Sequence, residues 1–140
     1  MRMSFMRNKT DIRKNILLVE DDRAIRDLCQ SVLSRNGFEC ISAADGVTGF
    51  ETYKVRKDDL ALVLSDLSMP AMGGIGMIHE ILNIDPGANV ILMSGYNPDE
   101  VVPCDIRKFC SVLRKPFTPA QLLQAVKRCL ECDTEVSATA

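Results

Sequence analysis

The chain has no long hydrophobic run. Its uninterrupted apolar stretches reach only four or five residues, whereas a helix that spans a bilayer needs about 20. We therefore expect no membrane insertion. The N-terminus also lacks the apolar core and the small-residue cleavage site of a secretory signal. These absences predict a cytoplasmic protein.

Outside the N-terminus the chain lacks an excess of basic residues, because acids outnumber them there. The whole chain carries a net charge of −2, but residues 1–14 carry +4 and the remainder −6. Nucleic-acid binding needs clustered Lys and Arg to neutralise phosphates, so we expect no direct contact with nucleic acid. Residues 1–14 are predicted to form a basic, flexible tail.

Histidine and paired cysteine motifs are also scarce. The single histidine, His79, lies in a predicted helix, and nothing around it resembles a phosphotransfer motif, so we expect an ordinary surface side chain. Of the six cysteines, Cys129 and Cys132 have C-x-x-C spacing, but no second pair or nearby histidine completes a zinc site. Most cysteines lie in apolar periodic segments, which predicts buried thiols.

Short apolar segments alternate with amphipathic ones along the chain. The apolar segments predict strands at residues 15–20, 38–42, 60–65, 90–93 and 110–114. Apolar spacings of three and four predict helices over 25–33, 47–57, 75–82 and 119–130. A fifth helix is expected over 97–109, but Pro103 in its middle should make it irregular. The pattern predicts an α/β domain over residues 15–132, a doubly wound parallel sheet with helices on both faces, followed by a frayed tail at 133–140.

Charged residues follow several of these strands directly. Glu20-Asp21-Asp22 comes after the first strand, Asp66 after the third and Lys115 after the fifth. Because the carboxyl ends of parallel strands share one edge of the sheet, the carboxylates of Asp21, Asp22 and Asp66 and the ammonium of Lys115 should meet there. Alone, Asp21 and Asp22 fit a helix-capping pair. Together, the charges favour a site for a divalent cation, Mg²⁺ by its preference for hard oxygen ligands, and a phosphoryl group.

Four motifs in order resemble the receiver domain of two-component response regulators. They are Leu-Val-Glu-Asp-Asp within residues 17–22, Leu-Ser-Asp-Leu-Ser-Met-Pro-Ala-Met-Gly-Gly at 64–74, Met-Ser-Gly-Tyr at 93–96 and Lys-Pro-Phe-Thr at 115–118. The resemblance extends over residues 15–132 and includes chemotaxis regulators, stand-alone receivers and receivers of hybrid sensor kinases. It implies a flavodoxin-like (βα)5 fold with a five-stranded parallel sheet in the order 2-1-3-4-5.

The resemblance also implies a chemistry for the acidic residues. Asp66 would be the phosphoacceptor, taking a phosphoryl group from a histidine kinase or phosphotransfer protein. Asp21, Asp22, Asp66 and the backbone carbonyl of Ser68 would hold Mg²⁺. Phosphoryl transfer requires mainly positioning and charge neutralisation, and these groups would supply both. The protein would be a signalling domain rather than an enzyme, acting on a downstream protein that the sequence does not identify.

Two further residues would respond to the phosphoryl group. Lys115 would pair with its oxygens, with a cis peptide bond to Pro116, and the hydroxyl of Ser94 would turn toward it. Receivers usually carry an aromatic switch three positions before the lysine, where this chain has Val112. We therefore expect the conformational response to pass through Ser94 and the segment at 95–109.

Two alternative functions follow from the same residues. A haloacid-dehalogenase-like phosphatase also uses a strand-end Asp with Mg²⁺, but it needs a second Asp two positions later, where this chain has Ser68. A receiver-like interaction module that accepts no phosphate is the other alternative. The set Asp21, Asp22, Asp66, Ser94 and Lys115 argues against that module.

Overall fold

The computed structural model describes residues 15–67, 73–95 and 110–139, with the backbone alone at Cys110 and at 132–139. The basic tail at 1–14 and the helix expected over 97–109 lie outside these residues. In the part of the chain that the structure describes, no helix combines the length and the apolar character needed to cross a membrane.

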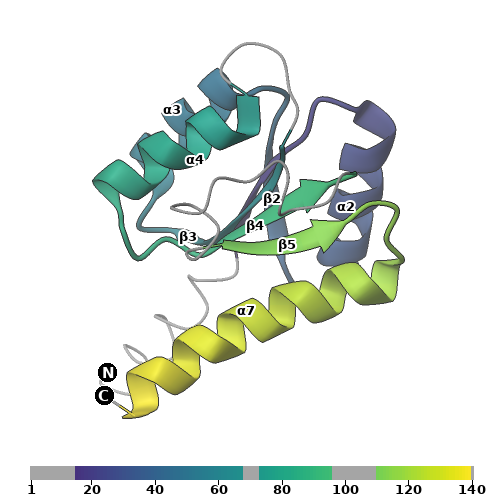
Figure 1. Cartoon of the computed structure of the whole chain (residues 1–140). Helices are drawn as coiled ribbons and strands as arrows, with labels where there is room; N and C mark the ends of the chain where they lie inside the picture. Colours follow the sequence, from purple (N-terminus) through teal and green to yellow (C-terminus); the bar gives the residue numbers. More distant parts are fainter. Residues whose placement is uncertain (1–14, 68–72, 96–109, 140) are drawn as a thin grey trace, which may run out of the picture.

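Strands and helices alternate along the chain (Figure 1). Their order is β1 (Asn15–Val19), α2 (Arg23–Arg35), β2 (Glu39–Ala43), α3 (Gly46–Arg56), β3 (Leu60–Asp66), α4 (Gly73–Ile84), β4 (Val90–Ser94), β5 (Cys110–Arg114) and α7 (Pro119–Thr139). All described strand pairs are parallel, and the sheet order is β2-β1-β3-β4-β5. This confirms the flavodoxin-like α/β fold expected from the sequence.

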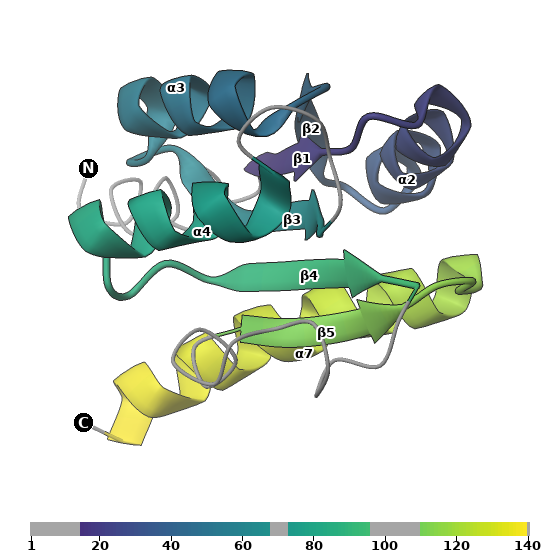
Figure 2. The same cartoon turned by 45° about the horizontal axis from the view of Figure 1, so that its top comes forward.

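Helices cover both faces of the sheet, as Figure 2 shows, with α3 and α4 on one face and α2 and α7 on the other. Alternate residues of the central strands point to opposite faces, so β1 contributes Leu17 and Val19 to the α3–α4 core and Ile16 and Leu18 to the α2–α7 core. All seven residues of β3 are buried. The two apolar cores therefore hold the central strands in register and fix where their carboxyl ends lie.

Local sequence signals explain where the helices begin. Asp45 accepts a hydrogen bond from the backbone N–H of Thr48 and caps α3. At α7, the Thr118 hydroxyl accepts from the Gln121 N–H, and the Gln121 side chain accepts from the Thr118 N–H. This reciprocal pair, followed by Pro119 in the first turn, is a strong helix start.

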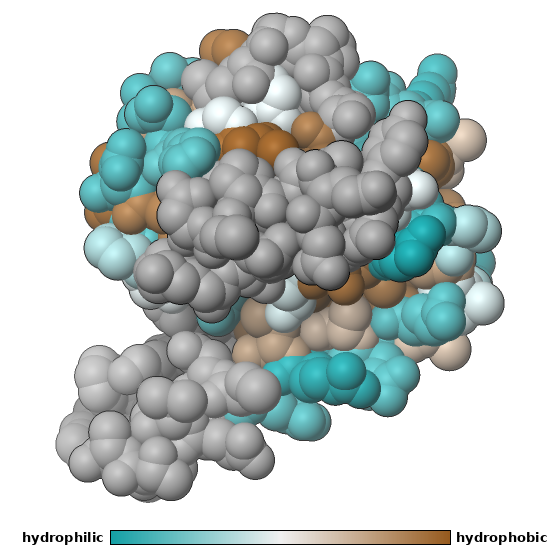
Figure 3. Space-filling view, viewed as in Figure 1, coloured by the Kyte–Doolittle hydropathy of each residue, from teal (hydrophilic) through white to brown (hydrophobic). Residues whose placement is uncertain are grey.

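Helix α7 is longer than the sequence pattern predicts. The structure continues it to Thr139, although we expected a frayed segment from 133. After Pro119 the chain contains no further Pro or Gly before Thr139, so no residue stops the helix. Hydrophilic side chains gather along its first turns (Figure 3), and its exposed residues there include Gln124, Lys127 and Arg128.

The three cysteines whose side chains the structure describes, and the histidine, lie as the sequence indicates. Cys29 is fully buried, Cys40 and Cys129 are half-buried against the same core, and none of these three forms a disulfide. Burial raises the pKa of Cys29 to about 12 and that of Cys40 to about 11. His79 is exposed on α4. These thiols therefore act as apolar packing groups and are poor nucleophiles at neutral pH.

Candidate functional site

Two buried acids lie side by side at the carboxyl edge of the sheet. β1 pairs with β3 so that Val19 lies opposite Ser65, and the next residues along the two strands are Glu20 and Asp66. Glu20 is fully buried and Asp66 is 7% exposed. Strand register alone therefore brings these two carboxylates together, although 46 positions separate them in the sequence.

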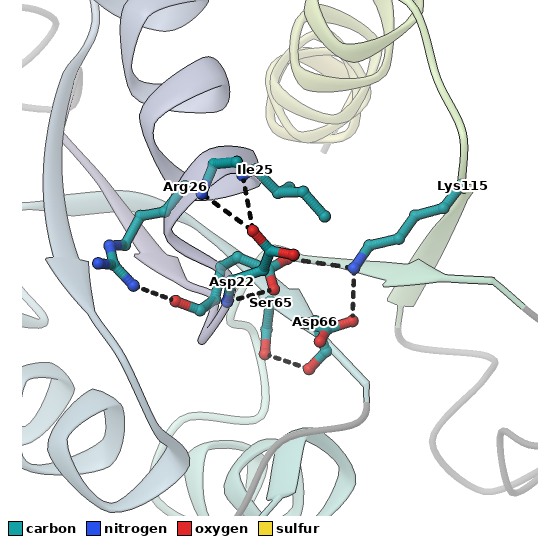
Figure 4. Close-up of polar contacts among 8 residues, drawn as sticks. Asp22, Ile25, Arg26, Ser65, Asp66 and Lys115 are labelled. Carbon is teal, nitrogen blue, oxygen red and sulfur yellow. Dashed lines mark hydrogen bonds and ion pairs between the residues drawn. The ribbon is translucent and has the colours of Figure 1, made fainter.

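Lys115 forms an ion pair with each of these two acids. Its Nζ lies 3.0 Å from Asp66 Oδ1 and 3.2 Å from Glu20 Oε1, and Figure 4 shows its side chain extending from beyond β5 to Asp66. Its own backbone N–H donates to the Ser94 carbonyl at 2.7 Å, and its bond to Pro116 is cis. The lysine is thus fixed at both ends, by the neighbouring strand and by two carboxylates.

Burial and ion pairing shift two pKa values in this cluster. Burial raises the pKa of Glu20, against the lowering effect of the Asp22 backbone N–H, and the charge of Asp66 raises it further. Burial lowers the pKa of Lys115, but its hydrogen bonds and charge interactions with Asp66 and Glu20 outweigh this, so the net shift is upward. The ammonium therefore stays charged at neutral pH.

The residues that fit a divalent cation are Glu20, Asp21 and Asp66. One carboxylate oxygen from each lies within 4.8 Å of the others. Three hard oxygen donors with one exposed member, Asp21, suit a cation that keeps several waters, as Mg²⁺ does. Crowded carboxylates also repel one another, and Lys115 offsets only part of that charge. The donor set therefore fits Mg²⁺.

Asp22, which the sequence interpretation assigned to the metal, has a different role in the structure. Its Oδ1 accepts hydrogen bonds from the backbone N–H groups of Ala24 at 2.9 Å and Ile25 at 3.3 Å, which makes it the N-cap of α2. Its carboxylate is not among the three that converge. Glu20 takes its place, so the candidate carboxylate ligands are Glu20, Asp21 and Asp66.

Glu20 is the site residue that the sequence interpretation missed. It directly follows the buried strand β1, while Asp22 directly precedes the helix, where Asp is a preferred N-cap. Of the three consecutive acids, the N-cap preference assigns Asp22 to the helix, which leaves Glu20 and Asp21 for the edge of the sheet. Ser68, whose carbonyl was expected to join the ligands, lies outside the described residues.

Asp66 and Leu67 are held close to α4 by a glycine. A Cβ on Gly74 would lie 2.0 Å from the Asp66 carbonyl oxygen, so only glycine fits there. The Gly74 N–H donates to the Leu67 carbonyl at 3.1 Å, and the Ser65 hydroxyl donates to the Asp66 carbonyl at 2.9 Å. Backbone packing therefore fixes the base of the Asp66 side chain.

The residues expected to respond to a phosphoryl group are near the site. Ser94 ends β4 and is almost completely buried, on the strand next to Asp66, since Met93 pairs with Asp66. Val112 is half-buried against the α3–α4 core and pairs with Leu92. The structure thus brings Asp66, Lys115 and Ser94 to one edge of the sheet and puts Val112 inside a strand.

Comparisons with known proteins agree with this geometry. Residues 16–127 match the response regulator receiver domain family. The chemotaxis protein CheY of Thermotoga maritima is 32% identical over 82% of this chain and 96% of its own length. The sensor kinase CckA of Brucella abortus is 35% identical over 83% of this chain, which is 12% of the kinase. The chain therefore belongs to the response regulator receiver domain family.

A solved structure whose name includes BeF3 and Mg+2 has the same architecture. The CheX–CheY–BeF3–Mg+2 complex of Borrelia burgdorferi has a TM-score of 0.75 and 30% identity to this chain, over 80% of this chain and 85% of that one. Receivers are signalling domains of two-component systems, and the match supports that class for this protein.

Proposed function

We propose that this protein is the phosphoacceptor of a two-component phosphorelay and that Asp66 accepts the phosphoryl group. The observation that supports the proposal most strongly is the contact of one ammonium, Lys115, with the Asp66 carboxylate at 3.0 Å beside two further acids. The donor would be a histidine kinase or phosphotransfer protein in the cytoplasm, and an unidentified downstream protein would receive the signal.

In the proposed transfer, phosphorus moves from a donor histidine nitrogen to a carboxylate oxygen of Asp66. Because Lys115 bonds Oδ1, Oδ2 is the oxygen that attacks phosphorus; the new Oδ2–P bond forms as the P–N bond to the donor imidazole breaks. The donor histidine leaves as neutral imidazole once it takes a proton from solvent. Asp66 attacks as its carboxylate, so no base has to remove a proton from it.

Glu20, Asp21 and Asp66 would hold Mg²⁺, which neutralises charge on the transferring group. Lys115 would exchange its contact with Asp66 for one with the new phosphoryl oxygens while Glu20 continues to hold its ammonium. Ser94, on the adjacent strand, would turn its hydroxyl to the same group. These movements would bias the segment that follows β4 and thereby carry the signal.

Acetyl phosphate, a small phosphoryl donor, provides the test. Wild-type protein with MgCl2 should gain one phosphoryl group by intact-protein mass spectrometry. Asp66→Asn, or wild type with EDTA, should gain none. Lys115→Met should still be labelled, because the ammonium stabilises the product rather than attacking.

The same samples separate the alternatives. A receiver-like module that accepts no phosphate would show no label in the wild type under any condition. A phosphatase of the haloacid-dehalogenase type would hydrolyse small phosphate esters through many turnovers and would lose that activity in Asp66→Asn. Labelling without sustained ester hydrolysis supports the receiver.

A further inference from the structure

The Asp21 carboxylate faces its two acidic neighbours without a side-chain partner. Asp21 is exposed, and among the described residues no hydrogen bond or ion pair holds its side chain. Glu20 and Asp66, by contrast, are both bonded to Lys115. The position of Asp21 is therefore set by its backbone, and whatever fixes the peptide bonds on either side of it controls where its carboxylate points.

Both of those peptide bonds are fixed by side chains. On the C-terminal side, the Asp22 N–H donates to Glu20 Oε2 at 3.1 Å. On the N-terminal side, the Glu20 carbonyl, which belongs to the planar peptide unit that begins Asp21, accepts from Nη1 of Arg26 at 2.8 Å. Figure 4 shows the Arg26 side chain turned back from α2 toward this carbonyl. A charged donor makes this a strong hydrogen bond.

The location of Arg26 is unfavourable for the helix that carries it. Its backbone N–H bonds the carbonyl of the N-cap Asp22 at 2.9 Å, so Arg26 lies in the first turn of α2. A cation in the first turn opposes the helix dipole, and no acidic residue in that turn compensates. A cation near a site for Mg²⁺ is also electrostatically unfavourable. Its hydrogen bond to the Glu20 carbonyl accounts for an arginine at this position.

We infer that Arg26 is a positioning residue of the acidic site, which holds the Glu20–Asp21 peptide bond so that the Asp21 carboxylate converges with Glu20 and Asp66. The inference rests on the proposed function, because it treats those carboxylates as cation ligands. It concerns a residue that touches none of the reacting atoms and acts through the backbone.

The direction in which Mg²⁺ affinity changes when Arg26 is replaced distinguishes a positioning role from a purely electrostatic one. Removing a nearby positive charge should tighten Mg²⁺ binding if Arg26 acts only through its charge. Removing a support of the ligand geometry should weaken it, and the loss of such supports commonly lowers metal affinity by about 10-fold or more. Arg23 is a matched control, because it lies in the same turn with a side chain 86% exposed and pairs only loosely with Asp27, at 3.8 Å.

The experiment is an MgCl2 titration of the whole chain, labelled with ¹⁵N and followed by NMR. Arg26→Met, which keeps most of the aliphatic stem, should raise the Kd for Mg²⁺ by about 10-fold, and Arg26→Lys, which keeps a charged donor, should give an intermediate value. Arg23→Met should bind Mg²⁺ as tightly as wild type or slightly more tightly. If Arg26→Met binds as Arg23→Met does, the inference is wrong.

A second readout needs no metal. In the absence of Mg²⁺, Arg26→Met should shift the amide resonance of Asp21, whose N–H belongs to the peptide unit that Arg26 bonds, clearly more than Arg23→Met does; equal shifts of this amide in the two variants would overturn the inference. If the wild type bound no Mg²⁺, the proposed function would fail and this comparison alone would decide the role of Arg26. If Arg26→Met did not fold, Arg26→Lys against Arg23→Lys would decide it by the same two readouts.

Discussion

Replacing Lys115 with methionine tests how the acidic pair is stabilised. The substitution keeps the aliphatic stem and removes the ammonium that contacts Glu20 and Asp66. The Glu20 side chain is only 1% exposed and that of Asp66 10%, so water replaces little of the lost interaction. Removing one partner from a buried ion pair typically costs about 3–5 kcal/mol.

Proton uptake limits this cost and makes it depend on pH. In the variant, Glu20 can remain protonated in the folded state, whereas in the unfolded chain it ionises near its ordinary pKa of 4.5. At about 1.36 kcal/mol per pKa unit, keeping it protonated costs at most about 3.4 kcal/mol at pH 7 and less than about 1 kcal/mol at pH 5. Because the pKa of Glu20 is raised in the folded state, its contribution to folding stability is fully present below pH 4.5 and is lost as pH rises.

Urea unfolding followed by far-ultraviolet circular dichroism, at pH 5 and pH 7 with EDTA, measures both values. Lys115→Met should be destabilised by up to about 3 kcal/mol at pH 7 and by less than about 1 at pH 5. Lys127→Met, which removes the same charge from an exposed position on α7, should change stability by no more than about 0.5 kcal/mol. Equal destabilisation of Lys115→Met at both pH values would refute the reasoning.

Three further outcomes follow from the structure. Gly74→Ala should lower the free energy of unfolding by about 1–3 kcal/mol or more, because the new Cβ would lie 2.0 Å from a backbone oxygen, while Gly87→Ala, whose nearest atom is 3.9 Å away, should not; urea unfolding compares them. Asp22→Ala should cost about 1 kcal/mol as a lost cap, and Asp22→Asn should retain Mg²⁺ binding in calorimetric titration. Folding stability should fall as pH rises above 9, because the thiols ionise near pH 9.0 in the unfolded chain, whereas in the folded protein the pKa of Cys29 is about 12 and that of Cys40 about 11. Unfolding measured against pH should show a shallower fall in Cys29→Ala than in the wild type.

The sheet was predictable because its signals are local and repeated. The apolar strands and most of the helix stripes stand out by their own periodicity. The signal for β3 is the uninterrupted apolar run at residues 60–64. The extension of α7 to Thr139 was not predictable in this way, because the segment after 132 has no apolar stripe. The helix continues there without a residue that stops it.

The site was predictable only in part. Asp66 and Lys115 each follow a strand alone, so strand ends identify them directly. Three consecutive acids follow β1, and sequence position does not say which of them point to the sheet edge. The strand register puts Glu20 next to Asp66, since Val19 lies opposite Ser65. Asp22 instead serves as the N-cap of α2. The role of Arg26 depends on a side chain folding back along its helix to a carbonyl, which no spacing rule reveals.

The position of the phosphoryl group tests the central claim most directly. Protein treated with acetyl phosphate and MgCl2 can be reduced with borohydride, which converts an aspartyl phosphate to homoserine, and then digested and sequenced by mass spectrometry. We predict homoserine at position 66 and at no other aspartate. Homoserine at position 21 or 22, or label that survives in Asp66→Asn, would contradict the assignment of Asp66 as the phosphoacceptor.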